Sequence, residues 1–390
     1  MLSAKVVKST GLLSPIEQTI SKEYYHKWMT RGFPKPGDVI LTTEGPLGEV
    51  IQLNKKTAKY ALGQRIVCLR GKNKKLDNGF LRYLLISPSQ QATMASFATG
   101  TTVLGISQKS LRRMPIQYPN FDEQKAIANV LSALDDKIEN IRRMNATLEA
   151  MAQAIFKDWF VDFGPTRRKI AATEQGGETN PVAIMGGLIP DPKKATQTAA
   201  LFPNGFGHDC MPETWEVETL KDVLELSYGK SLPKTKRTPG PVPVYGSGGV
   251  TGTHNKAMVE GPGIIIGRKG TVGSLYWEER DFFPIDTVFF VTPKNQIGLN
   301  YLWHLLSTLG LQNMNTDAAV PGLNRDNAYQ LKISDPGRPL KDAFEGIAAT
   351  LQTKLQANWA ENSALAETRD YLLPRLMSGQ IRATDIGGMR

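Results

Sequence analysis

The feature that most constrains this chain is a long internal repeat, because a duplicated unit has to fold twice. At a shift of 217 positions, residues 105–107 (GIS) align with residues 322–324 (GLN), and Ile116 aligns with Ile333. The alignment continues without a gap through the segments that follow. Upstream the shift drifts, as inserted loops would cause. The repeat predicts two copies of one unit, each a globular part followed by a long helix.

Both long helices carry an apolar seam with alternating steps of four and three, which is typical of a coiled coil. The first seam comprises Ile127, Leu131, Leu134, Ile138, Ile141, Asn145, Leu148, Ala152, Ile155 and Trp159. The second comprises Phe344, Ala348, Leu351, Leu355, Asn358, Asn362, Leu365, Arg369, Leu372 and Leu376. Asn120 followed by Glu123 forms a capping box that starts the first helix. Two such seams most simply pack on each other. The alternative, in which each helix lies on its own globular part, stays open.

The globular parts are predicted to be β-rich with short helices. Strand candidates are residues 38–41, 65–69, 263–267 and 287–291, and short amphipathic helices are expected at 78–86 and 300–308. The chain then divides into 1–119 (first globular domain), 120–163 (first long helix), 164–214 (linker), 215–336 (second globular domain), 337–380 (second long helix) and 381–390 (tail).

The positive charge is concentrated in one of these segments. The net charge is +10, and residues 1–119 hold 18 Lys and Arg against 6 Asp and Glu. Residues 215–336 hold 12 against 12. This excess favours a polyanionic partner such as nucleic acid, with a solvated basic surface as the plainer interpretation.

Motifs for catalysis, metal binding and membrane insertion are missing from the sequence. There is no Pro-Pro pair for an adenine methyltransferase loop, and residues 267–271 (GRKGT) have the wrong spacing for a P-loop. The four histidines are scattered, and the two cysteines, Cys68 and Cys210, lie far apart. No apolar run could span a membrane and no secretory signal is visible. We therefore expect a cytoplasmic protein without catalytic residues, cofactor or metal site.

Basic and polar residues on glycine-rich loops are the remaining candidates for contacts with phosphates and base edges. Any one of them is more easily explained as a solvated charge than as a base reader. The candidate DNA-binding residues are Lys55, Lys56, Arg70 and Lys72 in the first copy and Lys230, Lys234, Lys236, Arg237, Tyr245, Ser247, Arg268 and Lys269 in the second.

Four motifs carry a resemblance to a known family. Residues 155–163 (IFKDWFVDF) and 372–379 (LLPRLMSG) resemble the ends of the two long helices in the specificity subunits of type I restriction-modification enzymes. Residues 123–128 (EQKAIA) resemble the start of the first helix. Residues 201–203 (LFP) with 212–216 (PETWE) resemble the entry to the second recognition domain. The resemblance covers essentially the whole chain.

This resemblance implies an α+β fold with a pseudo-twofold internal repeat. Two β-rich target recognition domains would be separated by two long helices that form an antiparallel coiled coil. The subunit would read a bipartite site in double-stranded DNA and dock two methyltransferase (modification) subunits and the motor-nuclease (restriction) subunits. In this family AdoMet, ATP and Mg²⁺ belong to those partners, so no cofactor is expected here.

Some alternatives stay open at this point. Family members usually open the first copy as residues 215–220 open the second, whereas this chain starts with MLSAK. Either the start is truncated or the first recognition domain is short. A coiled-coil interaction scaffold without sequence-specific DNA binding is the alternative function. A self-contained enzyme would require the motifs that are missing.

Overall fold

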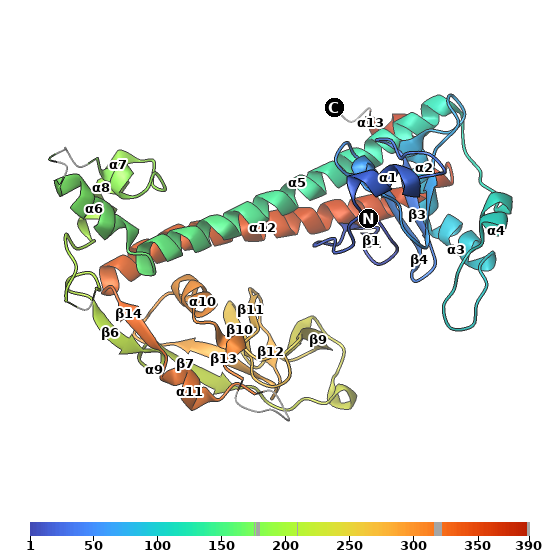
Figure 1. The fold of residues 1–390 in the computed structure, drawn as a ribbon. Helices are drawn as coiled ribbons and strands as arrows, with labels where there is room; N and C mark the ends of the chain where they lie inside the picture. The colour runs from blue at the N-terminus through green and yellow to red at the C-terminus, as the bar shows by residue number, and fades with distance from the viewer. Residues whose placement is uncertain (175, 177–179, 209, 316–321, 388–390) are drawn as a thin grey trace. The chain divides into compact units, whose positions relative to one another are not determined.

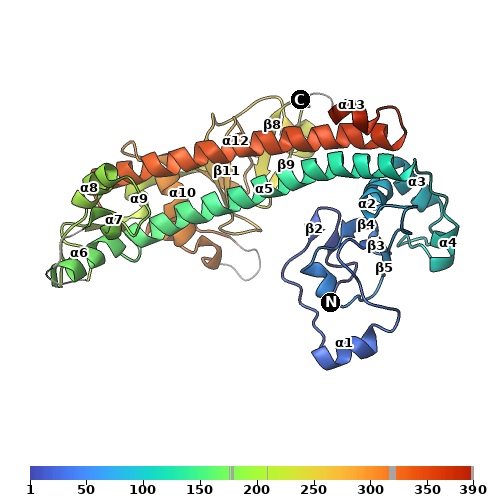
Figure 2. The ribbon, with the colours of Figure 1, turned by 90° about the horizontal axis from the view of Figure 1, so that it is seen from above.

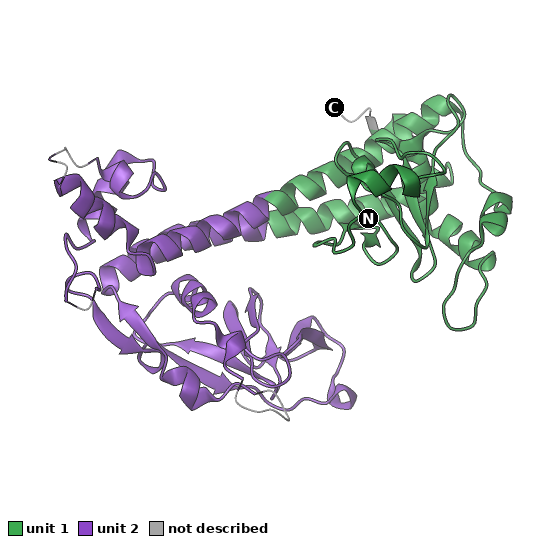
Figure 3. Ribbon diagram, viewed as in Figure 1, with its two compact units in different colours: residues 1–143, 358–390 green, residues 144–357 purple. Residues whose placement is uncertain are grey.

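The computed structural model describes residues 1–174, 176, 180–208, 210–315 and 322–387 (Figure 1). The chain forms two compact units, shown in Figure 3. Unit 1 comprises Met1–Arg143 and Asn358–Arg390, and unit 2 comprises Met144–Ala357. Each unit therefore contains one globular part and a portion of each long helix. The domain boundaries proposed from the sequence stay a prediction.

Unit 1 is built on a small antiparallel sheet. Its elements before the first long helix are β1 (Val7–Lys8), β2 (Gly11–Leu12), α1 (Lys22–Trp28), β3 (Val39–Thr43), β4 (Leu47–Gln52), the 3₁₀ turn η1 (Thr57–Lys59), β5 (Ile66–Leu69), α2 (Asn78–Ile86), α3 (Pro88–Ser96) and α4 (Gln108–Arg113). The main sheet has the order β4-β3-β5, with Ile40 opposite both Ile51 and Cys68. The β-branched, buried run of β3 makes it the central strand.

Unit 2 has a larger β-structure. Its elements are α6 (Gly164–Glu174), α7 (Pro181–Ile184), α8 (Pro192–Ala200), β6 (Glu216–Thr219), α9 (Leu220–Val223), β7 (Leu224–Tyr228), η2 (Lys234–Lys236), β8 (Val242–Gly246), β9 (Gly249–His254), β10 (Gly263–Gly267), β11 (Leu275–Glu278), β12 (Phe283–Pro284), β13 (Val288–Pro293), α10 (Leu299–Thr308), η3 (Leu311–Asn313), α11 (Arg325–Tyr329) and β14 (Lys332–Asp335). The strands form sheets with the orders β11-β10-β13-β7, β12-β8-β9 and β14-β6. The fully buried strand β10 lies inside the largest sheet, in keeping with its uninterrupted apolar sequence.

The two long helices, α5 (Phe121–Phe160) and α12 (Arg338–Met377), lie side by side and run antiparallel (Figure 2). In unit 1 the start of α5 meets the end of α12, because Ile127 and Leu131 share a buried cluster with Leu373 and Leu376. Lys137 also forms an ion pair of 2.6 Å with Glu361 across the two helices.

In unit 2 the opposite ends of the same helices meet. Phe156 and Trp159 of α5 share a buried cluster with Phe344 and Ala348 of α12, and the Phe156 and Phe344 rings are 5.2 Å apart. The prediction of an antiparallel helix pair is therefore confirmed. The helices also contact their globular parts, since Phe80 of α2 packs in the cluster of unit 1 and Tyr301 of α10 in that of unit 2.

The predicted seams form the buried faces of the helices. Among the ten positions of the first seam only Leu134 and Leu148 are partly exposed. The polar members Asn145, Asn358 and Asn362 are buried too. A buried polar side chain in an apolar seam makes other alignments of the two helices unfavourable. These asparagines therefore favour the observed pairing.

The segment 164–214, expected from its composition to be a linker, contains the short helices α6, α7 and α8. Ile184, Met185 and Ala195 from this segment are buried in the core of unit 2. Helices this short carry too few turns to produce a recognisable periodicity in the sequence. None of the helices in the described ranges is long and apolar enough to cross a membrane.

Candidate nucleic-acid interface

The lysines proposed in the first copy lie on exposed loops of unit 1. Lys55 and Lys56 follow β4, in a turn where the Asn54 side chain accepts hydrogen bonds from the Lys56 and Thr57 N–H groups, both at 2.9 Å. Lys72 is exposed between β5 and α2. Ammonium groups held on such loops are free to approach a phosphate backbone.

Arg70, in contrast, is bound to a buried carboxylate. Its Nε and Nη2 atoms donate to the two carboxylate oxygens of Asp38, each at 2.6 Å, and Asp38 is only 1% exposed. Burial acts to raise the pKa of Asp38, but hydrogen bonds from Arg70 and the Lys35 N–H outweigh it and lower this pKa. Burial and the nearby Asp38 charge raise the pKa of the Cys68 thiol to about 12. Arg70 therefore anchors the loop to the sheet.

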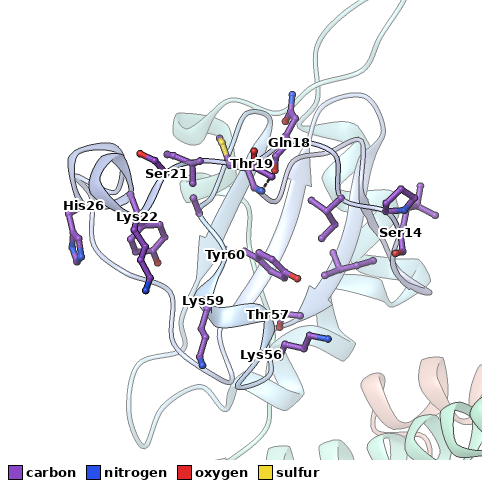
Figure 4. A pocket seen from close by; sticks show the side chains of 18 residues that line it. Ser14, Gln18, Thr19, Ser21, Lys22, His26, Lys56, Thr57, Lys59 and Tyr60 are labelled. Atoms are coloured by element: carbon purple, nitrogen blue, oxygen red, sulfur yellow. Dashed lines mark hydrogen bonds between the residues drawn. The ribbon is translucent and has the colours of Figure 1, made fainter.

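A pocket of about 890 Å³ in unit 1 includes one of the proposed residues (Figure 4). Lys56, Lys59 and Lys22 line it together with the aromatic rings of Tyr25 and Tyr60. Cationic groups beside aromatic rings are the combination that contacts phosphates and bases in many nucleic-acid-binding surfaces. The pocket thus extends the basic surface of unit 1 from the Lys55–Lys56 turn to α1.

In unit 2, Lys230, Lys234 and Lys236 are exposed on the segment between β7 and β8. Arg237 is half-buried and fixes this segment, because its Nη1 atom donates to the Thr251 carbonyl at 2.9 Å and its Nε atom to the Leu232 carbonyl at 3.2 Å. The lysines are therefore presented by a loop that Arg237 ties to β9.

Tyr245 differs from the other candidates in being only 7% exposed. Its hydroxyl donates to Glu278 at 2.9 Å inside unit 2, and burial with this hydrogen bond raises the pKa of the phenol. Its DNA-binding role stays a prediction, but the side chain is already engaged in the core. The strand β8 that carries it leads directly into the turn with Ser247.

Two of the proposed turns lie next to each other. The Ser247 carbonyl accepts hydrogen bonds from the Ser274 hydroxyl at 2.7 Å and from the Tyr276 hydroxyl at 3.0 Å. A methyl group on Gly270 would lie 3.2 Å from the Ser247 hydroxyl. Gly270 also has a φ of +86°, which favours glycine. The β8–β9 turn and the turn that carries Lys269 thus form one polar surface.

Arg268, on the second of these turns, stacks on an aromatic ring that the sequence had not singled out. Its guanidinium carbon lies 5.1 Å from the centre of the Tyr228 ring, and its Nη2 atom donates to the Asp286 carbonyl at 2.9 Å. Arg325 lies over the same ring at 4.9 Å. The Tyr228 side chain remains 46% exposed.

Tyr228 and Arg325 were missed because their relation is tertiary. Tyr228 ends β7, and Arg325 opens α11 directly after the Asn324 cap. The only sequence signal was the GLN motif of the repeat, which marks the start of α11 but says nothing about the residue after it.

The structure brings Arg268, Lys269 and Ser247 together with Arg325, while the candidates of the first copy lie in the other unit.

The described residues offer contacts suited to an extended anion. No group of three or more His, Cys, Asp and Glu side chains that could hold a metal ion occurs among them. What the surfaces present is ammonium, guanidinium, hydroxyl and aromatic groups on loops, the groups that bind nucleic acid backbones and base edges.

Comparison with known proteins identifies the family. The model of the type I restriction modification DNA specificity domain matches residues 8–150 and 212–336, which is more than half of the chain. The chain belongs to this family. The family is defined by DNA sequence specificity, and its specificity subunits are distinct from the catalytic subunits. The two matched segments follow the two copies of the internal repeat.

Curated relatives cover nearly the whole chain. The type I restriction enzyme HindI specificity subunit of Haemophilus influenzae is 24% identical, over 89% of this chain and 87% of its own. The MjaIX specificity subunit of Methanocaldococcus jannaschii is 23% identical, over 95% and 83%. The crystal structure of an S subunit of a type I system from M. genitalium has a TM-score of 0.57 at 22% identity, covering 96% and 91%. This likeness supports the fold described above.

Proposed function

We propose that this chain is the subunit that selects the DNA site of a type I restriction-modification complex by reading a bipartite site. Each copy of the repeat would contact one half-site, with base pairs between them left unread. The observation that carries the proposal is the double occurrence of the family's DNA specificity domain on a duplicated structural unit.

Modification and restriction subunits are the proposed protein partners. The long helices expose large apolar side chains away from their mutual seam, among them Met151, Trp359 and Tyr371 at 43%, 52% and 55% exposure. Aromatic residues and Met are enriched in protein–protein contacts, so we propose these side chains as contacts for the partner subunits. Two modification subunits and the motor-nuclease subunits would supply catalysis, and AdoMet, ATP and Mg²⁺ would be bound by them.

The proposal is tested by assembling the chain with the subunits encoded beside it and sequencing the methylated DNA of the host. Methylation is expected at a single split motif with two specified blocks and a constant unspecified interval. The same genes without this chain should leave no methylated motif. A methylated motif with one uninterrupted block would contradict the bipartite reading. Failure of the purified chain to bind duplex DNA at any salt concentration would contradict a DNA-reading role altogether.

A further inference from the structure

Two arginine side chains of unit 2 lie over one exposed aromatic ring. The guanidinium carbons of Arg268 and Arg325 are 5.1 Å and 4.9 Å from the centre of the Tyr228 ring. Each contact is a cation–π interaction, which holds the plane of a guanidinium group without using its N–H donors. The donors at the edge of each group therefore decide what the cluster can bind.

The two guanidinium groups differ in how many donors they have left. Arg268 uses Nε and Nη2 on the Asp286 carbonyl, at 3.3 Å and 2.9 Å. Arg325 has a buried Nε atom without a partner, and within the described ranges its two terminal nitrogens have no hydrogen-bond acceptor. Arg325 thus keeps the forked pair of N–H groups that matches two neighbouring acceptors.

The charges of this cluster are also uncompensated. No carboxylate of the described residues forms an ion pair with Arg268 or Arg325, although Asp326 follows Arg325 in the sequence and the Asp286 carbonyl accepts from Arg268. The two guanidinium charges over one ring repel each other. An anion or a strong pair of acceptors that approaches them would therefore stabilise the arrangement. Lys269 follows Arg268 on the same turn and Ser247 lies on the adjoining turn, so both add further donors.

We propose that Arg325 is a DNA-contacting residue of unit 2 and that Tyr228 and Arg268 position it. Its terminal nitrogens would donate to an acceptor pair on duplex DNA, either two phosphate oxygens or O6 and N7 of a guanine. The inference rests on the proposed function and adds the residue through which unit 2 makes a bidentate contact. It also gives Arg268 a supporting role, because its own donors are partly used.

The test compares Arg325→Ala with the wild-type chain, both assembled with modification subunits, on a library of half-site variants at several salt concentrations. Arg167→Ala is the control, since Arg167 is another arginine of unit 2 that lies over a ring, at 5.1 Å from Phe206. A guanine contact predicts a loss of about 5- to 150-fold at one base position, with relaxed specificity there. A phosphate contact predicts a uniform loss and a salt slope smaller by about 0.9.

Two further variants separate positioning from folding. Tyr228→Leu removes the ring and should reproduce part of the Arg325→Ala loss, whereas Tyr228→Phe keeps the ring and should bind like the wild type. Unchanged affinity, specificity and salt slope in Arg325→Ala would overturn the inference while leaving the proposed function intact. A wild-type complex that binds no DNA would overturn both.

Discussion

One position of the repeat is filled by a neutral amide in unit 1 and by a charged amine in unit 2. Gln124 and Lys341 align at the shift of 217, and both are buried, at 0% and 6% exposure. The Gln124 amide donates to the carbonyls of Lys75 and Pro119 at 3.0 Å and 2.9 Å, and its oxygen accepts from the Asp77 N–H. One side chain thereby fixes the loop before α2 to the start of α5.

Lys341 is surrounded by acids instead. Its Nζ atom lies 2.8 Å from an oxygen of Asp335 and 3.6 Å from one of Glu218, which stand on the paired strands β14 and β6. The described part of unit 1 has no strand pair at the corresponding place before α5. The same repeat position can therefore hold a neutral or a charged buried side chain. Which of the two it holds depends on whether a neighbouring strand supplies carboxylates.

The largest expected difference between the units follows from this pair of residues. Lys341→Ala leaves two carboxylates near the core without a counter-charge and should lower the stability of unit 2 by about 3–5 kcal/mol. Gln124→Ala orphans one N–H and two carbonyls and should cost unit 1 about 1–3 kcal/mol. Hydrogen exchange of peptides from each unit measures both effects at one pH. Lys354→Ala, at an exposed site of α12, is the control, and equal destabilisation of the two units would break the comparison.

A second pair of aligned residues differs in its response to acid. At the shift of 221, Tyr83 of α2 aligns with His304 of α10. The Tyr83 hydroxyl donates to Asp135 of α5 at 2.8 Å, whereas the His304 ring packs against Phe156 and Phe344. Burial lowers the pKa of His304 to about 4. Its neutral form is therefore the one that fits unit 2.

This difference predicts that acid destabilises unit 2 through His304. In the unfolded chain the His304 imidazole is protonated below about pH 6.5, whereas in folded unit 2 it stays neutral down to about pH 4. The free energy of unfolding therefore falls as the pH drops through this window. The decrease amounts to about 3 kcal/mol when complete. Urea unfolding followed by tryptophan fluorescence measures it, because four of the six tryptophans lie in unit 2. In the His304→Phe variant the unfolding free energy should change less with pH between 6.5 and 4. If it changed with pH in parallel with that of the wild type, His304 would have no such role.

The smallest expected effect concerns nonspecific DNA affinity. Because the excess charge lies in residues 1–119, replacing Lys55, Lys56 and Lys72 by alanine should weaken binding to random duplex more than replacing Lys230, Lys234 and Lys236. Removing one lysine that neutralises a phosphate lowers the salt slope by about 0.9. Titration of both full-length triple variants at several salt concentrations gives the slopes. Identical slopes would show that unit 1 has no electrostatic advantage.

Features repeated along the chain could be predicted from sequence, because periodicity reports directly which face is buried. The helix 78–86 and the strand 263–267 agree with α2 and β10 at both ends. The Glu123 N–H donates to the Asn120 side chain at 3.0 Å, as expected for the helix cap. The short helices in 164–214 were not foreseen, since four to eleven residues give little periodicity.

The candidate site was less accessible to sequence reasoning. Basic residues on loops could be found as a set, but burial and partners decide what each of them does. Arg70 is held by Asp38, Tyr245 by Glu278, and Arg268 by the Asp286 carbonyl. Arg325, which keeps its terminal donors, aligns with Gln108 in the first copy, so the repeat gave it no prominence. Such differences arise from interactions between segments far apart along the chain.

The way the chain threads the two units has a consequence for inheritance. Unit 2 is one uninterrupted stretch, Met144–Ala357, whereas unit 1 is assembled from both ends of the chain. Two crossovers inside the codons of α5 and α12 would therefore exchange unit 2 as a whole between related genes, together with its own portion of each helix. Such an exchange leaves the heptad register intact when both crossovers keep the seven-residue spacing. Such a double crossover would replace the second segment that matches the family model, residues 212–336, and would leave most of the first in place.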